Sequence, residues 1–224
     1  MSLFAYRVLN SGDSRREIRS LAARRRTGLA IALVLALGSG GCTSVASPPD
    51  RFYNLSIAEP SSGAGSCRLP GVLLVNRPVG NSLTGELGLV YRPEPGSPEL
   101  RRHVYHLWAD PPTVMIQAEL AAYLRKLGVA DTIITPNVRA RADYALNGRL
   151  VDMHRVVGDQ PHINLAIDLS LVRLRDRKVL IQSSGVQTLP AADVASAVKA
   201  YEVAALALFD GFLEDCQRVL KASP

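Results

Sequence analysis

The chain has few of the side chains that enzymes and metal proteins commonly use. Its 224 residues include four histidines, three cysteines and one tryptophan, and no H-E-x-x-H, C-x-x-C, G-x-S-x-G or glycine-rich phosphate motif occurs. His103 and His106 are three residues apart in a predicted strand, which should point them to opposite faces. Asp143, Asp152 and Asp168 could form a carboxylate cluster, but such residues more often line a solvated face. We therefore predict a protein that is not an enzyme and that has no cofactor and no metal.

Long hydrophobic runs are also missing, with one short exception near the N-terminus. Residues 24–26 are arginines, and the uncharged apolar segment 28–37 follows them. This segment is too short to cross a bilayer, which takes about 20 residues. A basic region, a short apolar run and then small residues are typical of a secretory signal.

The residue that ends this signal indicates its type. Gly41 stands directly before Cys42, which resembles the processing box of a bacterial lipoprotein, although Ser39 occupies a position where Leu is usual. We predict that residues 1–41 are a removed signal peptide and that Cys42 carries the lipid. The alternative is an ordinary signal on a protein exported to the periplasm, with Cys42 free or in a disulfide.

Little net positive charge remains once the predicted signal is set aside. The whole chain has a formal net charge of +6, but residues 1–41 hold seven arginines against Asp13 and Glu17, which leaves +1 for the remainder. The predicted mature part therefore lacks the basic footprint of a nucleic-acid-binding protein, and we exclude that class.

The mature chain is long enough for one domain with its own core. We predict a lipidated tether over 42–50 and a single periplasm-facing domain over 51–224. Thr43 and Ser44 follow the lipid cysteine, where an Asp would favour retention in the inner membrane, so the outer membrane is favoured. Cys67 and Cys216 could form a disulfide in the oxidising periplasm, or remain two buried thiols.

Apolar periodicity predicts an α+β domain. Residues 163–171 alternate apolar and polar, as in an antiparallel strand with one face on the core. The strand before it shifts its apolar parity after Leu150, which predicts a bulge. The predicted strands are 52–57, 72–75, 87–91, 103–108, 132–135, 144–153, 163–171 and 179–189.

Two helices complete the prediction. The first should begin with Asp110 as N-cap and Pro111 at the first helical position, and end before Gly128. The second should run from an Asp193 cap to about Leu220. We expect both helices to pack on one face of a mostly antiparallel sheet.

Three short motifs occur in a recognisable order. Residues 52–55 read FYNL, residues 108–111 read WADP and residues 143–148 read DYALNG. Together they resemble the ABC-type transport auxiliary lipoprotein family, which includes the paraquat-inducible protein C group. That family has an aromatic pair and a Leu near its mature N-terminus, Trp-Ala-Glu-Pro before its first helix (here with Asp for Glu), and a later D-Y-x-L-x-G strand.

The resemblance implies a non-enzymatic part of an envelope lipid transport system. Such a lipoprotein would sit at the outer membrane and dock an MCE-domain protein that works with an ABC permease and an ATPase, and it could self-associate. Phe52, Tyr53, Trp108 and Asp110 are the candidate docking residues, although a core position is the preferred prediction for the three aromatic ones. An alternative is a lipid-carrier or outer-membrane assembly lipoprotein that binds acyl chains itself.

The lipid on Cys42 can be tested by metabolic labelling. Palmitate should label the wild-type protein, and the label should disappear in Cys42→Ala because the acyl-accepting thiol is gone. Label retained by the variant would contradict the lipoprotein prediction.

Overall fold

The computed structural model describes residues 47–58 and 67–222, so the predicted signal peptide and Cys42 lie outside the described residues. Pro48–Pro224 is a single compact unit. No helix among the described residues is long and apolar enough to cross a membrane. In chain order the elements are β1 (Arg51–Tyr53), β2 (Leu69–Val75), β3 (Gly88–Arg92), β4 (Arg101–Trp108), α2 (Pro112–Lys126), β5 (Ala130–Ile134), β6 (Tyr144–Val156), β7 (His162–Arg173), β8 (Lys178–Pro190) and α3 (Val194–Ala222).

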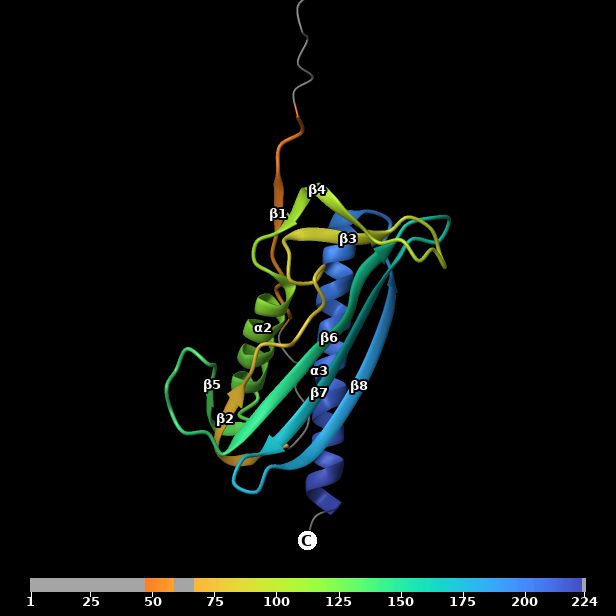
Figure 1. The fold of residues 1–224 in the computed structure, drawn as a ribbon. Coiled ribbons are helices and arrows are strands. Elements are labelled where there is room, and N and C mark those ends of the chain that lie inside the picture. Colours follow the sequence, from red (N-terminus) through yellow and green to blue (C-terminus); the bar gives the residue numbers. More distant parts are fainter. Residues whose placement is uncertain (1–46, 59–66, 223–224) are drawn as a thin grey trace, which may run out of the picture. The chain divides into compact units, whose positions relative to one another are not determined.

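The α+β prediction is confirmed, but the predicted, mostly antiparallel sheet is wrong. The eight strands form one curled, mixed sheet (Figure 1). Strands β6, β7 and β8 are antiparallel neighbours, as are β3 and β4. The pairs β1–β4, β2–β5, β2–β6 and β3–β6 are parallel. Parallel strands need a crossover connection, and α2 supplies one between β2 and β5.

Strand β6 organises the sheet. One of its edges pairs with β7 along its whole length. The other edge pairs with β2 near Tyr144 and with β3 near Arg155. The register shifts between Leu150 and Asp152, which confirms the predicted bulge. Because a bulge increases the local twist, one strand can serve two differently placed neighbours.

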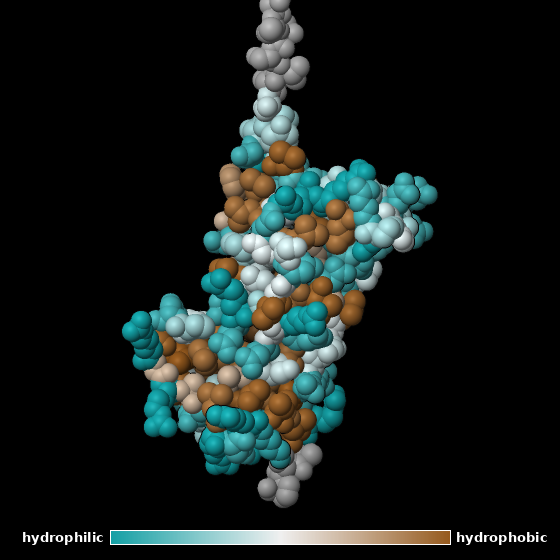
Figure 2. Space-filling model, viewed as in Figure 1, coloured by the Kyte–Doolittle hydropathy of each residue, from teal (hydrophilic) through white to brown (hydrophobic). Residues whose placement is uncertain are grey.

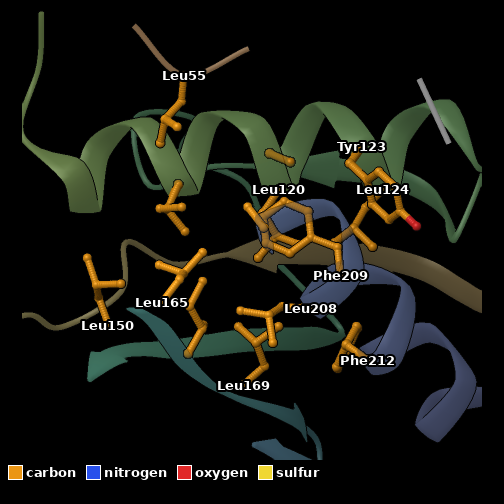
Figure 3. Close-up of a cluster of buried hydrophobic side chains, with 14 of the residues drawn as sticks. Leu55, Leu120, Tyr123, Leu124, Leu150, Leu165, Leu169, Leu208, Phe209 and Phe212 are labelled. Atoms are coloured by element: carbon orange, nitrogen blue, oxygen red, sulfur yellow. The ribbon is translucent and has the colours of Figure 1, made fainter. Parts of the chain in front are cut away.

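Both helices lie behind the strands in the view of Figure 1. Figure 3 shows Leu120 and Leu124 of α2 and Phe209 of α3 directed into one cluster above strand residues such as Leu165. All four side chains are buried. Burying a side chain of this size contributes about 1.5–3 kcal/mol to the free energy of unfolding, so this cluster holds both helices on the sheet.

The two helix N-termini differ from each other. Asp193 caps α3 as predicted, because its Oδ1 accepts the Ser196 N–H at 2.7 Å. Asp110 does not cap α2. The N-cap residue is Pro111, which offers no side-chain hydrogen bond, and Pro112 takes the first helical position. Two prolines in succession thus move the start of the helix one residue beyond the prediction.

A disulfide joins Cys67 to Cys216, two residues 149 positions apart with Cα atoms separated by 5.5 Å. Both residues are buried. The bond connects the segment before β2 to the C-terminal half of α3. Closing so long a loop restricts the unfolded chain and contributes up to about 5 kcal/mol in the chain-entropy description.

Candidate docking corner at the first strand

The short strand β1 brings two of the sequence motifs together. It pairs in parallel with the end of β4, so that Phe52 is opposite Leu107 and Tyr53 is opposite Trp108. The Ala109 N–H also donates a hydrogen bond to the Tyr53 carbonyl at 2.7 Å. Residues 51–57 and 103–110 therefore form one structural unit, which we call the N-terminal corner.

Trp108 is part of the core. Only 2% of it is exposed, and its ring packs edge-on against Tyr201 of α3, with ring centroids 5.8 Å apart. Burial raises the pKa of the Tyr201 hydroxyl, and the Asp152 charge adds to the shift. Trp108 connects the sheet to α3 and presents no surface to a partner in this conformation.

The other three candidate docking residues are accessible to different degrees. Phe52 is 62% exposed, so the preferred prediction of a core position is wrong for this side chain, which is of a type that is usually buried. Asp110 is exposed as well, and Tyr53 is partly buried. The Tyr53 hydroxyl is hydrogen-bonded to His106 Nδ1 at 2.9 Å. The corner thus offers one apolar and one acidic side chain on a fixed backbone.

Carboxylates from both helices hold the chain just after β1. Glu202 of α3 accepts the Ser56 N–H at 3.1 Å, and Glu119 of α2 accepts the Ile57 N–H at 3.0 Å. Leu55 between β1 and these contacts is buried and points toward α2 (Figure 3). The backbone that follows the predicted tether is therefore fixed to the core at several points.

The prediction that His103 and His106 point to opposite faces is wrong. Their ring centroids are 5.2 Å apart, in an edge-to-face arrangement. In the β3–β4 pairing, Gly88 is opposite Leu107 and Val90 is opposite Arg102. Two residues along β3 therefore correspond to five along β4, so β4 bulges and its side chains no longer alternate strictly between the two faces. The bulge comes so close that a Cβ on Gly88 would lie 3.0 Å from the His103 carbonyl oxygen.

The histidine pair belongs to a small aromatic ladder. The His103 ring also packs against Tyr91, with centroids 4.6 Å apart. Burial lowers the pKa of His103, with smaller contributions from His106 and Arg155, so its imidazole is neutral at pH 7. Among the described residues, no three His, Cys, Asp or Glu side chains are placed to share a metal ion.

The three aspartates that could have formed a carboxylate cluster have separate neighbours. Asp143 accepts the Val72 N–H at 2.8 Å. Asp152 is hydrogen-bonded to His154 Nδ1 at 2.5 Å. Asp168 stands opposite Arg149 in the β6–β7 ladder. These carboxylates support the fold at three different places.

A buried polar network around His154 was not predicted. His154 is 2% exposed, and besides Asp152 it contacts Arg92, whose Nε donates to His154 Nε2 at 3.3 Å. Arg92 in turn donates to the Ser97 carbonyl and so fixes the loop between β3 and β4. The spacing of Asp152 and His154, two residues apart on one strand face, is the signal that could have revealed it.

Figure 2 shows hydrophobic surface at the end of the unit where β1 lies, next to hydrophilic residues. Exposed apolar side chains of this region include Phe52, Leu87 and Val104. Apolar surface edged by polar residues is a common property of protein interfaces. The N-terminal corner is therefore the candidate docking site of this unit.

Comparisons with known proteins agree on the fold and on a family. The family model described as "ABC-type transport auxiliary lipoprotein component" matches residues 53–210. The structure of protein XCC0632 from Xanthomonas campestris, of the DUF330 family, superposes with a TM-score of 0.66 at 18% identity, covering 76% of this chain and 97% of that one. An uncharacterized protein superposes with a TM-score of 0.53 at 16% identity, covering 78% and 98%. No curated protein matches the chain.

A more distant likeness is found with PelC of Paraburkholderia phytofirmans, a protein crystallised as a dodecamer. The TM-score is 0.42 at 13% identity, and the match covers 74% of this chain and 93% of that one.

The core role of Trp108 predicts a large loss of stability on truncation. Trp108→Ala should lower the free energy of unfolding by about 3–5 kcal/mol because it leaves a cavity between β4 and α3. For a domain of this size that is a fall of about 10 °C in melting temperature. Phe52→Ala, at an exposed position, is the control and should melt within about 2 °C of wild type. Equal melting temperatures for the two variants would contradict this packing.

Proposed function

Because the chain belongs to the ABC-type transport auxiliary lipoprotein component family, we propose that it is a non-enzymatic docking subunit of an ABC/MCE-type envelope lipid transport system. The observation that carries this proposal is the family match across residues 53–210, which includes most of the compact unit. The family is one of auxiliary components and not a known enzyme family.

The proposed anchoring follows from the N-terminal sequence. Residues 1–41 act as the removed signal, Cys42 carries the lipid, and residues 42–50 link the lipid to the domain at 51–224. The outer membrane is the favoured location because Thr43 follows the lipidated cysteine. Nine residues can span at most about 30 Å, so the N-terminal corner stays close to the anchoring membrane.

The proposed docking surface is the exposed part of the N-terminal corner. Phe52 supplies an apolar anchor of the kind found at interface hot spots. The hydrogen bonds from Ser56 and Ile57 to Glu202 and Glu119 order the backbone beforehand, so less conformational entropy is lost when a partner binds. This favours docking on a preformed surface.

The proposed partner is an MCE-domain protein that works with an ABC permease and an ATPase. Phe52 and Asp110 would contact it, while Tyr53 supports the surface through its hydrogen bond to His106. We also propose that the auxiliary subunit can self-associate. Strand β5, at the end of the sheet order, pairs with β2 only among the described strands, so it has an unpaired edge for a second copy.

Crosslinking in cells tests both the partner and the surface. The tagged, lipidated protein should be crosslinked mildly, purified by affinity and analysed by mass spectrometry. We expect an MCE-domain protein with its permease and ATPase. Phe52→Ser should reduce their recovery at least fivefold, because it removes the apolar anchor without disturbing the core.

Val186→Ser is the matched control. Val186 is an exposed apolar strand residue on β8, away from the corner, and its substitution should leave recovery unchanged. Absence of any MCE-domain or ABC component from the wild-type sample would refute the proposed function. Equal recovery with Phe52→Ser and wild type would refute the docking surface while leaving the function standing.

A further inference from the structure

Two segments meet at the end of the unit opposite β1 (Figure 1). The β7–β8 turn and the residues leading into β6 are joined by a hydrogen bond from the Leu174 N–H to the Asp143 carbonyl at 2.9 Å. We call residues 141–144 and 173–179 the arginine tip. A hollow lies between its two segments, and its lining includes Arg141, Asp143, Arg173, Leu174 and Arg175.

Four cations of the arginine tip are exposed and unpaired. The side chains of Arg141, Arg175, Arg177 and Lys178 are exposed and have no hydrogen bond or ion pair with any described residue. Surface cations in a protein of nearly balanced charge are usually interspersed with acids. Here they gather where two segments meet, so the tip is a local positive patch on a mature chain whose net charge is only +1.

Acidic residues of the tip do not cancel this charge. Asp176 is held by Arg173, with Arg173 Nη2 and Asp176 Oδ2 2.7 Å apart. That contact lowers the pKa of Asp176 to about 2, so the two charges neutralise each other at all physiological pH values. Asp143 is engaged with the Val72 N–H at 2.8 Å. The carboxylate of Asp143 is thus the one acidic group of the tip left to oppose the four cations.

The backbone at the tip adds a further argument. Arg177 has φ of +56°, a left-handed conformation that Gly or Asn adopts at lower cost. A turn selected only for stability would have one of those residues there. Departures from a local rule of this kind are expected at functional sites, and the position of Arg177 in the cation cluster agrees with that expectation.

Apolar side chains stand beside the cations. Leu174 is 40% exposed and Val179 is 49% exposed, one on each side of the turn. A free phosphate or an acidic protein segment would be bound by the cations alone. Cations next to exposed aliphatic side chains are typical of surfaces that lie at the headgroup level of a bilayer, where both kinds of side chain find a partner.

We propose that the arginine tip binds the surface of a membrane that contains anionic phospholipids. The four cations contact headgroup phosphates, and Leu174 and Val179 lie at the boundary with the acyl chains. With β1 at the opposite end, this second contact holds the unit lengthwise on the membrane. The site is separate from the N-terminal corner and does not depend on the docking function.

Vesicle flotation tests the proposal. The mature chain, residues 42–224 with Cys42→Ser to remove the acyl acceptor, should float with vesicles of phosphatidylcholine plus phosphatidylglycerol and remain unbound with phosphatidylcholine alone. Raising the salt concentration should release it, because surface charge is screened within a Debye length. The double variant Arg175→Glu/Arg177→Glu should bind at least tenfold more weakly, and Leu174→Ser should bind a few-fold more weakly.

A control of equal net charge separates the tip from general electrostatics. Arg51→Glu/Arg77→Glu changes two exposed arginines outside the tip and should bind as wild type does. Equal loss in both double variants, or no preference for phosphatidylglycerol, would overturn the proposal. Binding of a polyglutamate peptide at the tip without vesicle binding would also overturn it and would assign the surface to an acidic protein. Binding of inorganic phosphate to the tip at millimolar concentration, again without vesicle binding, would also overturn the proposal and would assign the surface to a soluble anion.

Discussion

Strand β6 determines how the sheet, the two helices and both candidate surfaces are arranged. Its 13 residues are shared between β7 on one edge and, in turn, β2 and β3 on the other. Without the bulge after Leu150, a regular strand would have to offer both neighbours the same twist. With it, the sheet curls, and α2 and α3 pack against it as one layer. The positions of both candidate surfaces follow from this arrangement.

The start of the domain is fixed to the core by several separate interactions. The β1–β4 pairing, the Glu119 and Glu202 contacts and the Cys67–Cys216 disulfide all join the N-terminal segment to elements that come much later in the chain. A lipid anchor ahead of β1 would therefore be joined to a rigid body. Such a connection suits a subunit that must hold a docking surface at a defined distance from a membrane.

Sequence patterns predicted those features that depend on neighbouring residues. The alternation at 163–171 gave β7, the parity shift gave the β6 bulge, and Asp193 gave the start of α3. The aromatic Phe52–Tyr53 pair was correctly placed in a strand, and the order of three motifs indicated the family. Apart from the order of the motifs, each of these signals is local, because the residues that carry it are close in the chain.

Features that depend on distant partners were missed. The parallel pairings of β6 with β2 and β3 come from crossover connections, which leave no mark on strand alternation. His103 and His106 meet because β3 forces a bulge into β4, and that pairing is not visible in either strand. The start of α2 is a local exception: Asp110 is a residue type that favours the N-cap, but the adjacent Pro111 and Pro112 move the helix start by one residue. The arginine tip likewise needed the fold, since residue 141 and residue 175 are neighbours only in space.

The proposed docking role requires that the N-terminal corner is the surface that meets the transport partner. This can be tested by amide hydrogen exchange of the mature lipoprotein, measured alone and in complex with the MCE-domain protein that is recovered in the crosslinking experiment. We predict slower amide exchange over residues 51–58 and 103–110 in the complex, with β8 unchanged. Protection of residues 178–190 with the corner unchanged would contradict the account.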